Sequence, residues 1–179
     1  MGFLFRDKPQ TYAPPPIPPT PTMLGQSPVP ETPHAAGGRK AVRVDLPGRP
    51  GSYLDSEFAP KVDAFIAYAR EAGHDITFSS ADRTQEKQDE IIKSGSGTTP
   101  AEQSLHSAGH AVDVDQFAKF PAPKQLAIRR AAERAGLSWG GAWPKPDTMH
   151  FYFDPIPGQD RTGLINDFAD QVRRLKSGR

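Results

Sequence analysis

Two short segments of the chain carry the side chains best suited to chemistry. In the first, Asp113 follows His106 by seven residues, and in the second His150 follows Asp147 by three. One histidine and one aspartate from the first segment, with a histidine from the second, make a three-ligand set that leaves a fourth position on a zinc ion open to water. An open position is typical of a catalytic zinc site, because a structural site fills all four positions with protein ligands.

A different pairing of the histidines is less favourable. His106 and His110 form H-x-x-x-H, which is half of a zinc-binding helix motif. That motif needs a glutamate where Ser107 stands, and Gly109 disfavours the helix that would carry it. His110 is therefore expected to contact a metal ligand without binding the metal itself, or to lie at the surface. Asp115 is expected to be solvated or to support a ligand.

The composition excludes several other kinds of site and partner. The chain has no cysteine, so a disulfide framework and a thiolate site are ruled out. Residues 1–40 hold four basic and two acidic residues, which leaves 18 basic and 19 acidic residues beyond them. A nearly neutral body argues against nucleic acid as a partner. No apolar run reaches the ~18 residues of a membrane span, and the short apolar start is not expected to be a signal peptide.

Hydrophobic periodicity indicates an α+β fold with a small, mostly antiparallel sheet and flanking helices. Alternation over residues 111–117 places Asp113 and Asp115 on one face of a strand and Val112 and Val114 on the other. The segments expected to be extended are 41–46, 75 to about 83, 111–117 and 148–153, with a turn over 47–51. The expected helices are 55–72, 84–93, 123–135 and a closing helix lined by Leu164, Phe168, Val172 and Leu175.

The first part of the chain has a separate character. Of 20 prolines, 10 lie at or before Pro33, and repeated proline favours an extended polyproline conformation over helix or sheet. We therefore expect a proline-rich arm over residues 1–40 and a folded domain over 41–179. The arm is expected to act as a spacer or to dock on a protein partner such as a virion assembly.

The two segments resemble a known family. Residues 104–113 match S-x-H-x-x-G-x-A-x-D, and residues 147–150 match D-x-x-H followed by aromatic residues. These are signatures of the zinc D-Ala-D-Ala carboxypeptidase, dipeptidase and L-Ala-D-Glu endopeptidase family. The resemblance extends to residues 79–88 and 136–143, and it covers about 55–155. It implies zinc ligands at His106, Asp113 and His150, a general base at Asp147, and a substrate-carboxylate or oxyanion partner at Arg83.

Two residue types in this region also have structural interpretations. A surface ion pair is the alternative for Arg83. Core packing is the first expectation for Trp139 and Trp143, and lining a cleft is the second.

The resemblance implies a zinc-dependent peptidase that cleaves peptidoglycan stem peptides. Carboxypeptidase and dipeptidase members tend to carry glutamate where Asp147 stands, so the aspartate favours an L-Ala-D-Glu-type endopeptidase. The alternatives are a D,D-carboxypeptidase that trims terminal D-Ala and a non-catalytic structural or binding protein on the same fold. With no signal peptide, we expect a phage cell-wall-degrading enzyme. It would be made in the cytoplasm and act either after lysis or as part of the virion. The proline-rich arm favours the virion.

Overall fold

The computed structural model describes residues 39–95 and 103–178. A hairpin of β1 (Ala41–Leu46) and β2 (Arg49–Asp55) precedes a four-stranded antiparallel sheet in the order β3-β4-β6-β5. The remaining strands are β3 (Phe78–Ser80), β4 (Ala111–Val114), β5 (Ser138–Trp139) and β6 (His150–Tyr152). The helices are α1 (Ala59–Glu71), α2 (Gln85–Lys93), α3 (Ala122–Arg134) and α4 (Thr162–Lys176). The predicted α+β class with a small antiparallel sheet is confirmed.

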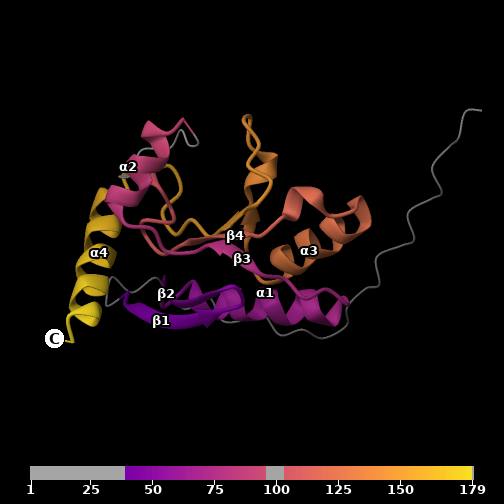
Figure 1. Ribbon diagram of the computed structural model, residues 1–179, viewed down its shortest axis with the longest axis horizontal. Coiled ribbons are helices and arrows are strands. Elements are labelled where there is room, and N and C mark those ends of the chain that lie inside the picture. The colour runs from indigo at the N-terminus through magenta and orange to yellow at the C-terminus, as the bar shows by residue number, and fades with distance from the viewer. Residues whose placement is uncertain (1–38, 96–102, 179) are drawn as a thin grey trace, which may run out of the picture. The chain divides into compact units, whose positions relative to one another are not determined.

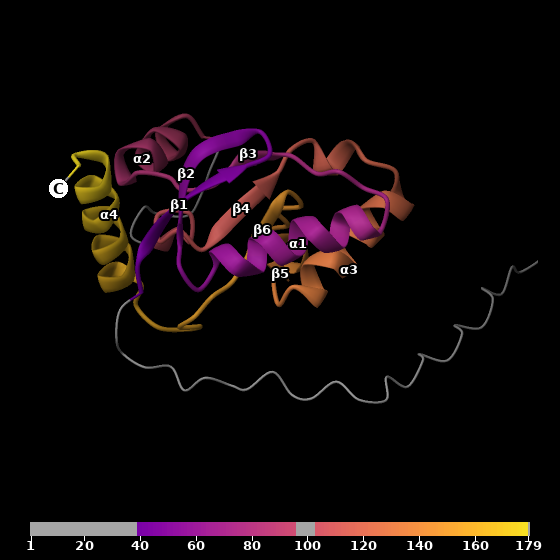
Figure 2. The same ribbon diagram turned by 90° about the horizontal axis from the view of Figure 1, so that it is seen from below.

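The main core lies between α1, α3 and one face of the larger sheet. Val62, Phe65 and Ala69 follow one another at helical spacing on α1 and are fully buried. The Phe65 ring stands 5.1 Å from that of Phe151 on β6. Figure 1 shows α1 and the hairpin on one side of the sheet and α2 on the other, and Figure 2 shows α1 running across the sheet with α3 beside it. The face of the sheet beside α2 is thus free of this core.

The register of the sheet brings the two chemistry-bearing segments together. Asp113 on β4 pairs directly with His150 on β6, and Ser80 on β3 pairs with Asp113 from the other side. As predicted, Val112 and Val114 point into the core, which leaves Asp113 on the opposite face. Because directly opposed residues in antiparallel strands place their side chains on the same face, this register positions Asp113 beside His150.

The expected turn over residues 47–51 is shorter than predicted and is followed by a strand. Pro47 and Gly48 alone form the turn, and β2 begins at Arg49. Gly48 has φ +82°, and an added Cβ would lie 2.9 Å from the Phe78 carbonyl oxygen, so the turn packs closely on β3. The sequence prediction was wrong here because Pro50 and Gly51 lie inside a hairpin strand, where pairing with β1 overrides their usual preference for turns.

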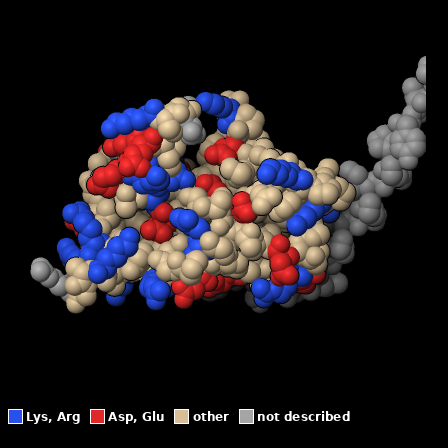
Figure 3. All heavy atoms as spheres, viewed as in Figure 1, with Lys and Arg blue, Asp and Glu red and all other residues tan. Residues whose placement is uncertain are grey.

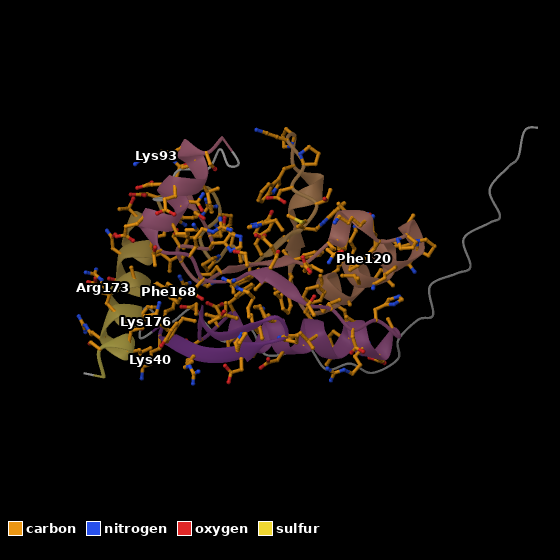
Figure 4. All side chains as sticks on the ribbon, viewed as in Figure 1. Lys40, Lys93, Phe120, Phe168, Arg173 and Lys176 are labelled. Carbon is orange, nitrogen blue, oxygen red and sulfur yellow. The ribbon has the colours of Figure 1, made fainter. Side chains whose placement is uncertain are left out.

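The C-terminal helix α4 packs on the loop that carries His106. Gly109 has φ +69°, and an added Cβ would lie 2.4 Å from the Phe168 ring, so this ring covers the backbone of the loop directly. From the hairpin, the Asp55 backbone N–H donates to the Gly109 carbonyl oxygen at 3.0 Å. Figure 4 shows Phe168 on α4 turned toward the rest of the domain and Arg173 turned away from it. The 104–110 loop is thereby held from two sides by distant segments.

Several predicted element boundaries differ from the structure. The first helix starts at Ala59 rather than near residue 55, and the strand predicted over 111–117 ends at Val114. The short strand β5 was not predicted. On α4, Leu175 is 48% exposed, whereas the buried Ile165 was missed. Among the described residues, no helix has the length and apolar character needed to cross a bilayer.

Candidate metal centre and cleft

The structure gathers the three predicted zinc ligands at one point. His106 Nε2 lies 3.2 Å from Asp113 Oδ1 and 3.2 Å from His150 Nδ1, and the last two atoms are 3.1 Å apart. All three residues are buried. Within the part of the chain that the structure describes, this is the one cluster of three or more acidic, histidine or cysteine side chains suited to hold a metal ion.

The hydrogen bonding of His106 fixes which of its nitrogens is available to a metal. His106 Nδ1 lies 2.6 Å from the Ala81 carbonyl oxygen, which can only accept a hydrogen bond, so we assign the ring proton to Nδ1. In the neutral imidazole, Nε2 then presents a lone pair toward Asp113 and His150. A backbone carbonyl that orients a ligating histidine in this way is a common support for metal sites.

The spacing of the three ligand atoms fits zinc. Ligands held at about 2.0–2.1 Å in a tetrahedral arrangement stand about 3.3 Å apart, close to the separations found here. Burial lowers the pKa of His150 and so favours the neutral form that binds metal. Burial alone would raise the pKa of Asp113, but the adjacent His106 and His150 imidazoles hold it well below its ordinary value. The cluster therefore offers two imidazole nitrogens and one carboxylate oxygen, which matches the predicted zinc cofactor.

Arg83 lies beside this cluster and is not a surface ion pair. Its Nη2 donates to Ser80 Oγ at 2.8 Å and to Asp113 Oδ2 at 3.4 Å, while its Nη1 donates to Gln88 Oε1 at 2.6 Å. Its side chain is only 15% exposed. These contacts use three of the five N–H donors of a guanidinium and leave others for a ligand in the cleft. Burial lowers the pKa of Arg83, and the nearby Asp113 and Asp147 oppose that shift.

We expect the Arg83→Lys variant to lose about 10-fold to 100-fold in kcat/KM. An ammonium group cannot reproduce the planar fork that contacts Gln88, Ser80 and Asp113 together. The measurement is steady-state hydrolysis of a peptidoglycan peptide, with the zinc dissociation constant determined in parallel to detect any disturbance of Asp113. Unchanged kinetics would mean that Arg83 has no more than a structural ion-pair role.

Asp147 lies in the loop before β6, at the mouth of the site. Its backbone N–H donates to the Gly140 carbonyl oxygen at 3.1 Å, and its own carbonyl oxygen accepts from the His150 N–H at 3.3 Å. An added Cβ on Gly140 would lie 2.8 Å from the Asp147 carbonyl oxygen, so glycine permits this close approach. The residue is exposed and lines the same cleft as the three ligands. The structure thus brings together all five sequence-predicted site residues, while their roles remain predictions.

The ligands lie in a cleft of about 990 Å³. Figure 3 shows the surface hollowed between the α2 side and the opposite wall. Trp143 and Tyr152 line the cleft together with Met149, Asp154 and Arg161. Trp143 therefore follows the second expectation for the two tryptophans, whereas Trp139 packs against the core as first expected. Alternation along β6 places Tyr152 on the same face as His150, whereas no motif pointed to the paired Asp154 and Arg161.

His110 neither contacts a metal ligand nor lies at the surface, which were the two positions expected for it. The side chain is fully buried, between the Phe58 and Phe153 rings, and neither ring nitrogen has a hydrogen-bond partner among the described residues. Its Nε2 lies 3.7 Å from Asp55 Oδ1. Burial lowers the pKa of His110 to about 3, a shift strengthened by Arg39 and opposed by Asp154, and burial also raises the pKa of Asp55. Both groups are thus driven toward their neutral forms.

This burial predicts a loss of stability in acid. Between pH 6.5 and about 3 the unfolded chain binds a proton at His110 that the folded chain does not, so the free energy of unfolding decreases as pH falls. The slope attributable to His110 is about 1.4 kcal/mol per pH unit. Urea unfolding of the metal-free protein at several pH values should give a smaller slope for His110→Gln than for the original chain. Asp55, whose pKa is raised, acts in the opposite direction. Equal slopes in the two proteins would contradict the prediction.

Two histidines, one carboxylate and an adjacent acid in an open cleft are typical of a catalytic zinc site. Residues 97–153 match the family model described as D-alanyl-D-alanine carboxypeptidase. This match confirms the resemblance indicated by the motifs, over the part of the chain that holds His106, Asp113, Asp147 and His150. No curated protein matches the chain.

The solved structures that are similar to this one include an L-Ala D-Glu endopeptidase and two VanY structures. The L-Ala D-Glu endopeptidase ChiX of Serratia marcescens is 27% identical, with a TM-score of 0.43 over 56% of this chain and 80% of that chain. The vancomycin resistance D,D-pentapeptidase VanY of a VanB-type resistance cassette, a mutant in complex with Zn(II), is 18% identical, with a TM-score of 0.51 over 72% of this chain and 85% of that one. VanYB in complex with D-alanine-D-alanine is 17% identical, with a TM-score of 0.51 over 79% and 92%. The two VanY structures share the fold.

Proposed function

We propose that the protein is a zinc-dependent hydrolase of peptidoglycan stem peptides, with an L-Ala-D-Glu-type endopeptidase activity. The observation that carries this proposal is the triangle of ligand atoms from His106, Asp113 and His150, with separations of 3.1–3.2 Å, in a cleft that Asp147 also lines. The family match supports the coarser part, hydrolysis of peptidoglycan peptides. The aspartate at position 147 supports the endopeptidase branch, since carboxypeptidase members tend to carry glutamate there.

Each residue of the site has a role in amide hydrolysis. When bound by His106, Asp113 and His150, zinc supplies a Lewis acid and lowers the pKa of a coordinated water to about 7. The Asp147 carboxylate accepts a proton from the attacking water and delivers it to the nitrogen of the leaving amine. Free N–H groups of Arg83 donate to the carbonyl oxygen of the scissile bond, where negative charge develops. Asp113 Oδ2 holds the guanidinium in place for this purpose.

The cleft also has groups suited to a peptide that carries carboxylates. Lys145 and Arg83 are cationic and line the cleft, and Lys145 is exposed at its rim. Carboxylate groups of a stem peptide are attracted to such side chains. Asp154 neutralises the third cation of the cleft, Arg161, by a direct ion pair. Among the described residues of the cleft, Lys145 and the N–H groups of Arg83 that Asp113, Ser80 and Gln88 leave unused are therefore the cationic groups available to the substrate.

The second candidate is a D,D-carboxypeptidase that removes terminal D-Ala. The description of the matching family model favours it. The two activities use the same site and differ in the bond that is cut. A carboxypeptidase releases free D-Ala, whereas an L-Ala-D-Glu endopeptidase releases peptides that begin with D-Glu.

The deciding experiment is digestion of purified sacculi, with mass spectrometry of the released products. We expect peptides with a new D-Glu amino terminus and no release of free D-Ala. Free D-Ala as the only product would assign the carboxypeptidase activity instead. Asp147→Asn and chelator-treated protein serve as inactive controls. No product from zinc-loaded protein would favour the non-catalytic alternative, a structural or binding protein on this fold.

We also propose that residues 1–40 attach the enzyme to a larger assembly, as in a virion-associated phage enzyme that reaches the cell wall as part of the particle. The proline content of this segment supports the proposal. Residues 1–38 lie outside the part of the chain that the structure describes. Arg39 and Lys40 contact the domain, since the Arg39 carbonyl oxygen accepts from Gln171 Nε2 and the Lys40 N–H donates to Ser56 Oγ.

These contacts place the end of a clean deletion at residue 38. A protein that starts at Arg39 should keep its zinc content and its hydrolysis of soluble peptides but should no longer be incorporated into the assembly. Loss of activity on deletion would mean that the segment serves the catalytic domain itself.

A further inference from the structure

Tyr152 lies in the cleft beside a zinc ligand. It follows His150 by two residues on β6, so both side chains project from the same face of the sheet, while Phe151 between them is buried in the core. Tyr152 is half-buried and lines the cleft. Its ring centroid is 5.5 Å from that of His150. The tyrosine hydroxyl is therefore part of the wall that a bound peptide meets next to the ligands.

The hydrogen bonding of Tyr152 leaves its proton available. Trp143 Nε1 lies 3.0 Å from the Tyr152 hydroxyl oxygen. An indole N–H can only donate, so the tyrosine oxygen is the acceptor in this contact. The hydroxyl proton then points elsewhere, and none of the described residues accepts it. A half-buried hydroxyl with an unused proton in a cleft can donate to a ligand oxygen.

The surrounding rings hold this donor in one place. The Trp143 centroid lies 5.2 Å from that of Tyr152 and 5.1 Å from that of His150, so the three rings contact one another. Such packing restricts the rotation of the tyrosine before any ligand arrives. A donor fixed in advance costs little conformational entropy when the ligand binds. The arrangement thus favours binding of one kind of atom, a hydrogen-bond acceptor, at one position.

We propose that the Tyr152 hydroxyl donates a hydrogen bond to a backbone carbonyl oxygen of the bound peptide on the Tyr152 side of the scissile bond. Trp143 is its positioning residue. A neutral hydroxyl suits a neutral peptide carbonyl, whereas carboxylates are better matched by the cations Arg83 and Lys145 elsewhere in the cleft. This inference rests on the proposed function and adds a substrate-binding contact to it.

The test uses Tyr152→Phe, which removes only the hydroxyl. We expect KM for a soluble stem peptide to rise about tenfold, with kcat within about twofold, because a ground-state hydrogen bond is lost. Zinc content should not change. Tyr68→Phe is the matched control, since Tyr68 lies on α1 under the Arg134 guanidinium and does not line the cleft. An unchanged KM for Tyr152→Phe, or a loss of zinc from it, would overturn the inference.

A double-mutant cycle tests the positioning role of Trp143. Trp143→Phe keeps an aromatic ring and removes the indole N–H, so we expect KM to rise about threefold in the original chain. The same substitution in the Tyr152→Phe background should then have no further effect, because the hydroxyl that Trp143 positions is gone. Equal effects in both backgrounds would mean that Trp143 acts independently of Tyr152.

A binding measurement separates failure of this inference from failure of the proposed function. Titration calorimetry compares Asp147→Asn with the Asp147→Asn/Tyr152→Phe double variant for the same stem peptide. Weaker binding by the double variant supports the contact even if the original chain hydrolyses nothing, in which case only the proposed activity fails. Equal binding by the two variants overturns the contact even when hydrolysis is observed. Absence of both binding and hydrolysis overturns both proposals.

Discussion

Asp113→Ala should abolish zinc binding and reduce peptidase activity by more than about 100-fold, a larger loss than is typical for residues that only support metal ligands. Its Oδ1 is the sole carboxylate atom of the ligand triangle, and its Oδ2 also holds Arg83. The variant loses one ligand and the partner of a half-buried cation together. His106→Ala and His150→Ala should likewise lose zinc. Zinc stoichiometry of the purified proteins, measured by elemental analysis, is the direct readout.

Asp115→Ala is the matched control for these variants. Asp115 follows β4, is half-buried, and accepts a hydrogen bond from Gln116 rather than contacting a ligand. We expect it to retain zinc and activity. Full zinc occupancy in all three ligand variants would refute the assignment of the metal centre.

Asp147→Asn should retain zinc and its fold while losing about 10²-fold to 10⁴-fold in kcat, the usual contribution of a general base. The amide has the size of the carboxylate but cannot accept the proton. The backbone contacts of residue 147 with Gly140 and His150 do not involve the side chain, so they survive the substitution. The measurement is kcat on a stem peptide at matched zinc content.

Asp63→Asn, an exposed position on α1 away from the cleft, controls for the loss of a carboxylate in general. Near-normal turnover by Asp147→Asn would assign the base to another residue. Loss of zinc from this variant would instead place Asp147 among the metal-binding groups.

The three metal ligands could be predicted from the sequence because the face on which each strand places its side chains is set locally. Alternation along β4 fixes the face of Asp113, and alternation along β6 fixes the face of His150. What the sequence could not provide was the register, and it is the pairing of Asp113 with His150 that brings the ligands together. Register depends on the whole sheet and on the turns that connect its strands.

Residues whose roles depend on distant partners were predicted less well. β2 was missed because its Pro50 and Gly51 favour turns locally, whereas the pairing with β1 is tertiary. The burial of His110 depends on Phe58 and Phe153, which no local pattern connects to it. Arg83 was identified, but its contacts with Ser80 and Gln88 arise only once β3 and α2 are in place.

The packing of Phe168 over Gly109 makes metal occupancy and the docking of α4 thermodynamically linked. Zinc bound at His106 restrains the 104–110 loop, and that loop is the surface on which Phe168 rests. When α4 leaves the domain, the 104–110 loop loses its contact with Phe168. Zinc needs His106 to be held in place, so it binds such open states less tightly and lowers their population. Amide hydrogens of this 15-residue helix should therefore exchange more slowly when zinc is bound. A helix that supplies no ligand thus becomes one of the determinants of how tightly the metal is held.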